Sequence, residues 1–470
     1  MPPGAPDAVL AHAAAGFDRH LERVRAFVRQ PSVSATGEGM DAMARLVVTS
    51  LTELGACAEL VATDGWPVVV GELDEGQPRT LLLYGMYDVQ PVAGERWCAA
   101  PFGGEIVELP DLGPSLVSRG VYNSKGPLAG VLSAIASVRE AAGRLPVNVR
   151  FLVEGEEELA SRSLPAFLRA HSGRLACDGV YSPFYGQDRR GTPIVKLGFK
   201  GVQFLELTCR GGAWGGPTRQ GIHGAEAAWI ASPAWHLVRT LATMVDGLDR
   251  SVVAGLPAQG TPTDEDEALL RPLAERFDAA TVLEQQQVAR MKHAGGSLAQ
   301  LRHYLFDSAI NIDGIAAGHA GEGTKSLLPH EATAKLSVRL VPGMPIDEVR
   351  ARLAEHVERV GGGAVEVRFL DGYPPARTPS SAPIAQALIE ACRIGDLVPE
   401  VWPTHGGAAP FSVLAEALGR PLVCGGLGHG GRQHAPDEYA TVSGMRLFER
   451  SVIEFLYRFA AIDRSSTLPT

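Results

Sequence analysis

The side chains best suited to chemistry fall in four short stretches, each beside a glycine or at the end of an apolar run. They read YGMYD (84–88), RGVYNSKGP (119–127), EGEEELAS (154–161) and HAPDE (434–438). Glu156, Glu157 and Glu158 form an acidic triplet. Without a cation nearby, one carboxyl of a facing pair keeps its proton to higher pH, which suits general acid–base catalysis. The alternative interpretation is a solvated acidic start of a helix.

Alternating helices and strands are expected to position these stretches. Helical periodicity covers 7–30 and 38–55, strand-like runs follow at 66–73 and 79–85, and the alternation continues to residue 182. This order predicts an α/β fold with a mainly parallel sheet covered by helices. Functional residues are then expected where the strands end.

A different order of elements begins near residue 200. Strand, helix, two strands, helix and strand follow one another at 201–211, 232–245, 308–317, 332–342, 345–360 and 364–372. This βαββαβ order predicts an inserted ferredoxin-like α+β domain, with an acidic, Gln-rich addition of helix and loop at roughly 249–300. The predicted domains are therefore 1–200 and 376–470, which form one α/β domain, and 201–375, inserted between its two parts.

The composition and the hydropathy pattern limit the expected binding partners and the expected cellular location. The chain has 470 residues and a formal charge of −10, and no basic stretch recurs, so nucleic acid is not an expected partner. The N-terminus lacks a secretory leader pattern, and no stretch reaches about 18 uninterrupted apolar residues, so we expect a cytoplasmic protein that is not inserted in a membrane. The six cysteines form no CxxC pair and are expected to be reduced thiols. Small amino-acid-like or peptide-like molecules are the expected partners.

In this arrangement the four stretches resemble those of the dinuclear zinc exopeptidases that include aminoacylase, carnosinase and the carboxypeptidase G type. The resemblance covers nearly the whole chain, including NIDGI, EGTKSLLP and VRLVPG in the inserted domain. It implies a general base at Glu157 and five zinc-ligand positions, which fall on Met86, Asn123, Glu158, Pro183 and His434. Three of these, Met86, Asn123 and Pro183, have lost their ligand chemistry.

The donor chemistry of this set argues against a pair of zinc ions. Zinc takes thiolate, imidazole or carboxylate donors, whereas a thioether and a neutral amide suit it poorly and proline offers nothing. Glu158 and His434 remain, and their combined charge leaves about +3 from two zinc ions uncompensated. We therefore expect no cofactor, with one zinc ion on Glu158 and His434 as the alternative. His405 and His429 follow no metal-binding spacing and are expected to be loop histidines.

Asp88 matches the residue that orients the missing histidine, and we expect it to pair with Lys125 or another cation, with a part in the chemistry as the alternative. Met86 is expected to fill space in an apolar wall.

The resemblance also implies a substrate grip on the inserted domain. His223 matches a lid histidine that reaches the site of a neighbouring subunit, which implies a homodimer through this domain. Ser326 and Arg339 match residues that hold a substrate carboxylate or amide, and Gly407 and His434 are assigned to the same substrate-binding set. Two residues depart from the family pattern: Ala408 replaces a serine and Lys200 replaces an arginine.

Three functions remain open on the sequence. The favoured one is a zinc-independent enzyme with Glu157 as acid and base, together with Glu158 and His223. It would act on an amino-acid-like or peptide-like substrate by acyl transfer, amide ring closure, isomerisation or dehydration, in a specialised biosynthetic step. The alternatives are a non-catalytic peptide-binding relative and a single-metal peptidase or amidohydrolase.

Overall fold

The chain forms two compact units in this computed structural model, which describes residues 4–393, 395 and 398–462. The first unit takes its described residues from 1–198, 377–403 and 413–470, and the second from 199–376 and 404–412. In the part of the chain so described, no helix is both long and apolar enough to cross a bilayer.

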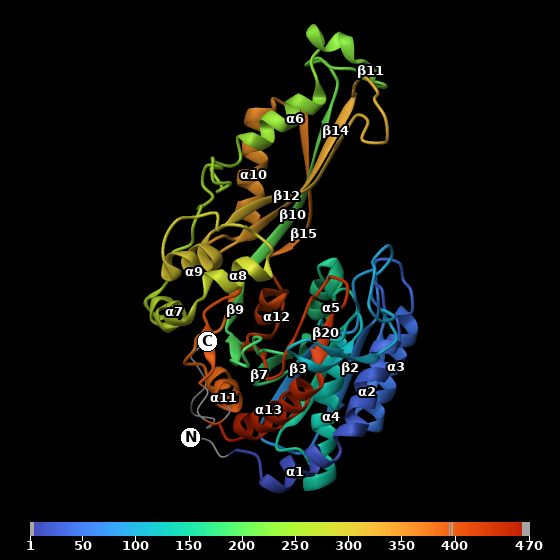
Figure 1. The fold of residues 1–470 in the computed structure, drawn as a ribbon, viewed down its shortest axis with the longest axis vertical. Helices are drawn as coiled ribbons and strands as arrows, with labels where there is room; N and C mark the ends of the chain where they lie inside the picture. Colours follow the sequence, from blue (N-terminus) through green and yellow to red (C-terminus); the bar gives the residue numbers. More distant parts are fainter. Residues whose placement is uncertain (1–3, 394, 396–397, 463–470) are drawn as a thin grey trace. The chain divides into compact units, whose positions relative to one another are not determined.

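An eight-stranded sheet organises the first unit (Figure 1). Its central strands β6, β3, β7 and β18 run parallel, whereas β1 and β2 at one edge run antiparallel to their neighbours, as β8 does to β18. The predicted mainly parallel sheet is confirmed. In spatial order the strands are β1 (Cys57–Val61), β2 (Val68–Leu73), β6 (Asn148–Glu154), β3 (Thr80–Met86), β7 (Gly179–Pro183), β18 (Leu422–Gly425), β8 (Ile194–Lys196) and β17 (Glu400–Trp402).

Helices flank this sheet. α4 packs on β3 and β7, α11 packs on β18, and α13 lies against both of these helices, while α3 packs on β1 and β2. α4 is buried from Lys125 to Val138, because the sheet and neighbouring helices surround its N-terminal part. The helices of this unit are α1 (Asp7–Ala15), α2 (Phe17–Arg29), α3 (Met40–Glu53), α4 (Lys125–Ala142), α5 (Leu164–His171), α11 (Pro383–Ala391) and α13 (Val442–Ala460); α12 (Phe411–Leu418) begins in residues of the second unit.

A second, smaller sheet of the first unit has no counterpart in the sequence-based predictions. Its strands lie in the order β19 (Gly430–Gly431), β20 (Tyr439–Thr441), β5 (Gly113–Val117) and β4 (Glu105–Leu109). β20 pairs antiparallel with β5, so that Tyr439 faces Val117 across more than 300 residues of sequence. This pairing fixes where two of the four chemical stretches meet.

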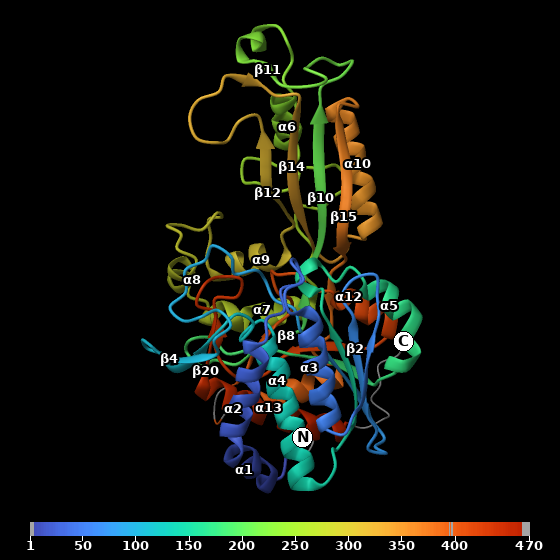
Figure 2. The ribbon, with the colours of Figure 1, turned by 90° about the vertical axis from the view of Figure 1, so that its right-hand side faces the viewer.

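The second unit is the predicted ferredoxin-like sandwich (Figure 2). Its antiparallel sheet has the order β12 (Ala309–Ala317), β14 (Glu331–Leu340), β10 (Gly201–Arg210) and β15 (Val365–Tyr373). α6 (Pro233–Ala242) and α10 (Ile346–Gly361) cover it and bury residues such as Leu207, Leu237 and Leu353. The Gln-rich addition folds as α7 (Asp264–Arg276), α8 (Ala279–Gln285) and α9 (Ser297–Phe306), and two short strands, β11 (Ile222–His223) and β13 (Leu327–Leu328), pair with each other.

Candidate active site

The small sheet brings Asn123 and His434 together. The chain leaves β5 at Val117 and enters β20 at Tyr439, and these two residues are paired, so the segment after one strand runs beside the segment before the other. A hydrogen bond from the Ser118 N–H to the Glu438 carbonyl at 3.0 Å continues this pairing. The amide nitrogen of Asn123 consequently lies 3.1 Å from Nε2 of His434.

Glu438 anchors the loop that carries Asn123. Its carboxylate accepts the backbone N–H groups of Gly120, Tyr122 and Asn123 at 2.9–3.1 Å and a bond from Arg119 Nη1 at 3.1 Å. Burial raises the pKa of the Glu438 carboxyl, and the backbone N–H donors act against that rise. The loop also turns at Gly120, whose φ is +84°, a value that strains other residues. These contacts fix the backbone of Asn123.

Asn123, Glu158 and His434 form a closed polar triangle. The Asn123 amide donates to Glu158 Oε1 at 2.8 Å, and His434 Nε2 lies 3.2 Å from the same oxygen and 3.1 Å from Oε2. Gln90 donates to Oε2 at 2.8 Å, so both carboxylate oxygens of Glu158 are engaged. The bond to Glu158 raises the pKa of His434. The imidazole therefore shares a charge-assisted contact with Glu158 when it is protonated.

Asp88 binds the backbone of Glu157 and Glu158 next to this triangle. Asp88 is fully buried and accepts the backbone N–H groups of Glu157 at 3.2 Å and Glu158 at 3.0 Å, at the start of the short helix Glu157–Leu159. Burial, followed by the charge of Glu158, raises the pKa of Asp88 to about 7. Burial, followed by the charges of Glu158 and Asp88, also raises the pKa of Glu157 well above its usual value. Asp88 therefore retains its proton towards neutral pH, and Glu157 retains its proton to higher pH than an ordinary glutamate.

The expected pairing of Asp88 with Lys125 is wrong: no ion pair joins them in the described structure. The Lys125 ammonium instead donates to the Gln30 carbonyl at 2.6 Å. Burial lowers the pKa of Lys125 to about 7, and Glu438 and Asp88 act against that fall. Asp88 takes backbone N–H partners because the turn after β6 directs two of them at its carboxylate.

Met86 and Pro183 lie at strand ends of the same sheet. Met86 is the last residue of β3 and pairs with Glu154 of β6, and its side chain is half-buried. Pro183 is the last residue of β7, beside Gly425 of β18, and is buried. Neither side chain carries a charged oxygen or nitrogen.

The remaining predicted substrate-binding residues belong to the second unit and fall in two places. His223 is exposed and pairs with Leu327 through β11 and β13, and Ser326 precedes that strand. Arg339 lies near the far end of β14, roughly 25 Å along the strand from its first residue at about 3.3 Å per residue. Gly407 lies beside Lys200, whose N–H donates to the Gly407 carbonyl at 3.1 Å. Within one chain, Ser326 and Arg339 therefore do not meet.

His405 and His429 both lie in loops. His405 is half-buried and its Nδ1 accepts the Gly407 N–H at 3.1 Å. His429 lies in the first unit, with Nδ1 2.9 Å from the Gln187 carbonyl and Nε2 3.1 Å from the Tyr439 hydroxyl. Burial lowers the pKa of His429.

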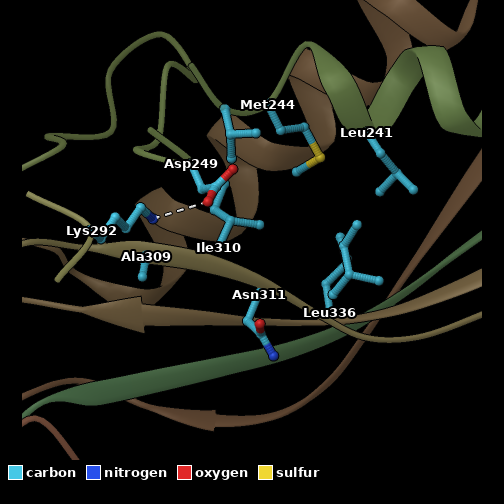
Figure 3. A pocket seen from close by; sticks show the side chains of 10 residues that line it. Leu241, Met244, Asp249, Lys292, Ala309, Ile310, Asn311 and Leu336 are labelled. Carbon is cyan, nitrogen blue, oxygen red and sulfur yellow. Dashed lines mark ion pairs between the residues drawn. The ribbon is translucent and has the colours of Figure 1, made fainter. Parts of the chain in front are cut away.

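A cavity of about 320 Å³ opens in the second unit (Figure 3). Apolar side chains of α6, of the segment that follows it, of β12 and of β14 line most of it, and Lys292 and Asp249 form an ion pair at 3.2 Å on its rim. None of its lining residues was predicted as a site residue. Among the residues that the structure describes, one group of three His, Cys, Asp or Glu side chains has ligand atoms that all lie within 4.8 Å of one another. It consists of His293, which follows Lys292 of the cavity rim, and of His303 and Asp307.

Sequence reasoning missed Glu438 and Gln90. Glu438 stands in HAPDE but was given no role, because its three N–H partners arrive only through the pairing of β5 with β20. Gln90 lies two residues beyond Asp88 and has no sequence pattern that would indicate its bond to Glu158.

Residues 82–458 match the model of a protein family described as Peptidase family M20/M25/M40. Because this match covers most of the chain, the protein belongs to that family, and the predicted resemblance is confirmed. The Cys-Gly metallodipeptidase dug1 of Schizosaccharomyces pombe is 26% identical over 370 residues, 73% of each chain. The Beta-Ala-His dipeptidase of Homo sapiens is 26% identical over 302 residues, 63% of this chain and 56% of that protein.

Solved structures give the same assignment. The M20 family metallo-carboxypeptidase Sso-CP2 from Sulfolobus solfataricus has a TM-score of 0.87 at 29% identity, covering 95% of this chain and 100% of that one. Human carnosine dipeptidase 1 has a TM-score of 0.82 at 22% identity, covering 98% and 100%, a likeness that shows the fold alone. The chain is therefore a peptidase-like member of a family that includes dipeptidases.

Proposed function

We propose that this protein is a zinc-independent enzyme that acts on an amino-acid-like or peptide-like substrate, with Glu157 as its acid and base. One observation carries the proposal: the amide nitrogen of Asn123 donates to Glu158 and lies within hydrogen-bond distance of His434. Glu158, the only carboxylate among the five ligand positions implied by the resemblance, thus already accepts a neutral donor, and His434, the only imidazole, lies against both residues.

The donor set does not fit a pair of zinc ions. Glu158 and His434 supply one carboxylate and one imidazole, fewer than the three protein ligands usual for even one catalytic zinc. Asn123 directs its amide nitrogen at both of them, while its oxygen accepts the Ser124 hydroxyl at 2.9 Å. An N–H group cannot bind a cation, so a metal would have to displace these hydrogen bonds without gaining a charged ligand. We derive no step through a metal.

Proton transfer is the chemistry that the site supports. The raised pKa of the half-buried Glu157 lets it hold a proton to higher pH than an ordinary glutamate and donate that proton to a leaving nitrogen, or take one from an attacking amine. Acyl transfer, amide ring closure, isomerisation and dehydration each require such a proton transfer. Much of the remaining rate acceleration in these reactions can come from holding the reactants in the correct position. Hydrolysis is less well supported, because these residues include no serine or cysteine placed as a nucleophile.

Substrate binding draws on the second unit. Arg339 offers a planar guanidinium for a carboxylate, and Gly407 is kept in the substrate-binding set on the resemblance. Because His223 and Ser326 lie at the other end of β14 from Arg339, one substrate would contact all of them only if a second copy supplied His223 and Ser326. We therefore include a homodimer through this unit in the proposal.

Replacement of Glu157 tests the proposal. The purified protein is incubated with Cys-Gly, β-Ala-His and a panel of N-acyl amino acids and dipeptide esters, with and without EDTA, and products are followed by mass spectrometry. We expect turnover that survives EDTA, and a fall of about 100-fold or more in kcat for Glu157→Gln with little change in KM. Glu105→Gln, an exposed strand residue, is the control and retains activity.

Two results would overturn the proposal. Turnover that appears only with added zinc would assign a single-metal hydrolase. Saturable ligand binding that is equal in the wild type and Glu157→Gln, with no product formed from any panel member, would assign a non-catalytic peptide-binding protein.

A further inference from the structure

A second cluster of ligand-type side chains lies in the Gln-rich addition of the second unit. His303 is on α9 and Asp307 follows the end of that helix four residues later, so the two share one helix face. His303 Nδ1 lies 2.8 Å and His293 Nε2 lies 3.8 Å from Oδ2 of Asp307. The two imidazole rings stack with centroids 3.9 Å apart at an angle of 17°.

These distances are close to those of a metal site. Tetrahedral zinc with bonds of about 2.0–2.1 Å places its donor atoms roughly 3.3 Å apart. The 3.8 Å separation of His293 from Asp307 needs only a small adjustment, and the His303–Asp307 hydrogen bond holds a proton where a cation would lie. All three donor atoms lie within 4.8 Å of one another.

Neighbouring side chains hold Asp307 and the loop that carries His293. Gln259 donates to Oδ1 of Asp307 at 2.6 Å, which leaves Oδ2 facing the two histidines. Gln300 donates to the backbone carbonyl of His293 at 2.7 Å and ties its loop to α9. Hydrogen bonds of this kind fix the direction of metal ligands in known sites.

An ion pair of the adjacent residue Lys292 also holds the loop that carries His293. Lys292 pairs with Asp249 at 3.2 Å, so the charge of this neighbouring ammonium is already balanced (Figure 3). Lys200 donates to the backbone carbonyl of Asp307 at 2.6 Å, not to its carboxylate. Both imidazoles are part-exposed, so water can complete the coordination of a bound ion.

We propose that His293, His303 and Asp307 bind one divalent transition-metal ion, with zinc as the favoured ion. Two imidazoles and a carboxylate match the borderline preference of zinc and disfavour calcium and magnesium, which take all-oxygen sites. The ion would join the 286–296 loop to the end of α9. The site shares no residue with the Glu158–His434 cluster, so it does not depend on the proposed function.

Zinc titration of the full-length protein tests this site. Metal-free protein competes with a chromogenic chelator for ZnCl₂, and thermal unfolding is recorded with and without ZnCl₂. We expect one site per chain and a zinc-dependent rise in Tm, because an ion that binds only the folded state stabilises it. Asp307→Asn and His293→Gln should each weaken zinc binding by at least about ten-fold and abolish the rise in Tm.

Matched variants separate this site from others. His319→Gln changes an exposed histidine of the same unit, and His434→Gln changes the strand-end cluster; both should bind zinc as the wild type does. Gln259→Leu removes only the orienting bond and should weaken binding by about ten-fold. The proposal is overturned if the wild type binds no zinc in this assay, or if His293→Gln, a part-exposed loop change, binds zinc with unchanged affinity.

Discussion

The side-chain amide of Asn123 donates a hydrogen bond to Oε1 of Glu158 at 2.8 Å, across 35 residues of sequence. A carboxylate at position 123 would face Glu158 with no proton between them. The neutral amide therefore gives Glu158 a hydrogen-bond donor at a position where an aspartate would add a second acidic group.

Asn123→Asp should destabilise the protein. The change replaces a donor with a negative charge at 2.8 Å from Glu158, so we expect a loss of about 1–3 kcal/mol in the free energy of unfolding near neutral pH. Urea unfolding measures it. Asn123→Ala, which removes the hydrogen bond without adding charge, is the control and should cost less. An Asp variant as stable as the Ala variant would show that the pocket accepts a further carboxylate.

Glu438→Gln should lower the free energy of unfolding more than Glu95→Gln does, although both glutamates contact Arg119. Glu438 is 1% exposed, and its loss leaves the equally buried Arg119 without its closest buried partner, so we expect a loss of about 3 kcal/mol or more. Glu95 contacts Arg119 at 2.9 Å but is 25% exposed, and Glu95→Gln should cost about 1 kcal/mol or less. Equal losses in chemical denaturation of the two variants would contradict the anchoring role of Glu438.

Glu154→Gln should change how stability depends on pH. Glu154 Oε1 accepts the Tyr84 hydroxyl at 2.5 Å and the Ser161 hydroxyl at 3.0 Å, and a glutamine oxygen can keep both bonds. Burial raises the pKa of Glu154 from 4.5 to about 8. The folded state then holds a proton that the unfolded state loses, so the contribution of this group is fully present below about pH 4.5 and is lost as pH rises through about 8.

The measurement is the free energy of unfolding of both proteins between about pH 5 and 8. The stability of the wild type relative to Glu154→Gln should fall by on the order of 1.4 kcal/mol per pH unit in this window. Glu105→Gln, at an exposed position on β4, should show no such trend. A difference between the wild type and Glu154→Gln that does not change with pH would mean that Glu154 is not buried as a neutral acid.

Long apolar runs made most of the fold predictable. β3 and β6 are buried on both faces of the large sheet and appear in the sequence as TLLLYGM and NVRFLVE, and the helices that flank them have clear periodicity. The small sheet was missed because β5, GPSLV, and β20, YAT, are short and contain no long apolar run. Their pairing depends on tertiary structure, and so does the role of Glu438.

The resemblance, together with the acidic triplet, singled out Glu157, Glu158 and His434, and the structure brings Glu158 and His434 within hydrogen-bond distance. Their roles in catalysis and binding stay predictions. Within the histidine and aspartate cluster, only the spacing of His303 and Asp307 was visible in the sequence, as a helical i, i+4 pair. His293 joins them through a loop whose path no periodicity predicts.

Zinc content tests the central claim most directly, because that claim is that the pocket around Glu158 and His434 holds no pair of zinc ions. Protein purified without added zinc is dialysed and analysed by inductively coupled plasma mass spectrometry as the wild type, Asp307→Asn and His434→Gln. We predict that Asp307→Asn contains almost no zinc and that His434→Gln contains as much as the wild type. Two zinc ions per chain in Asp307→Asn, lost on further replacement of His434 or Glu158, would contradict the account.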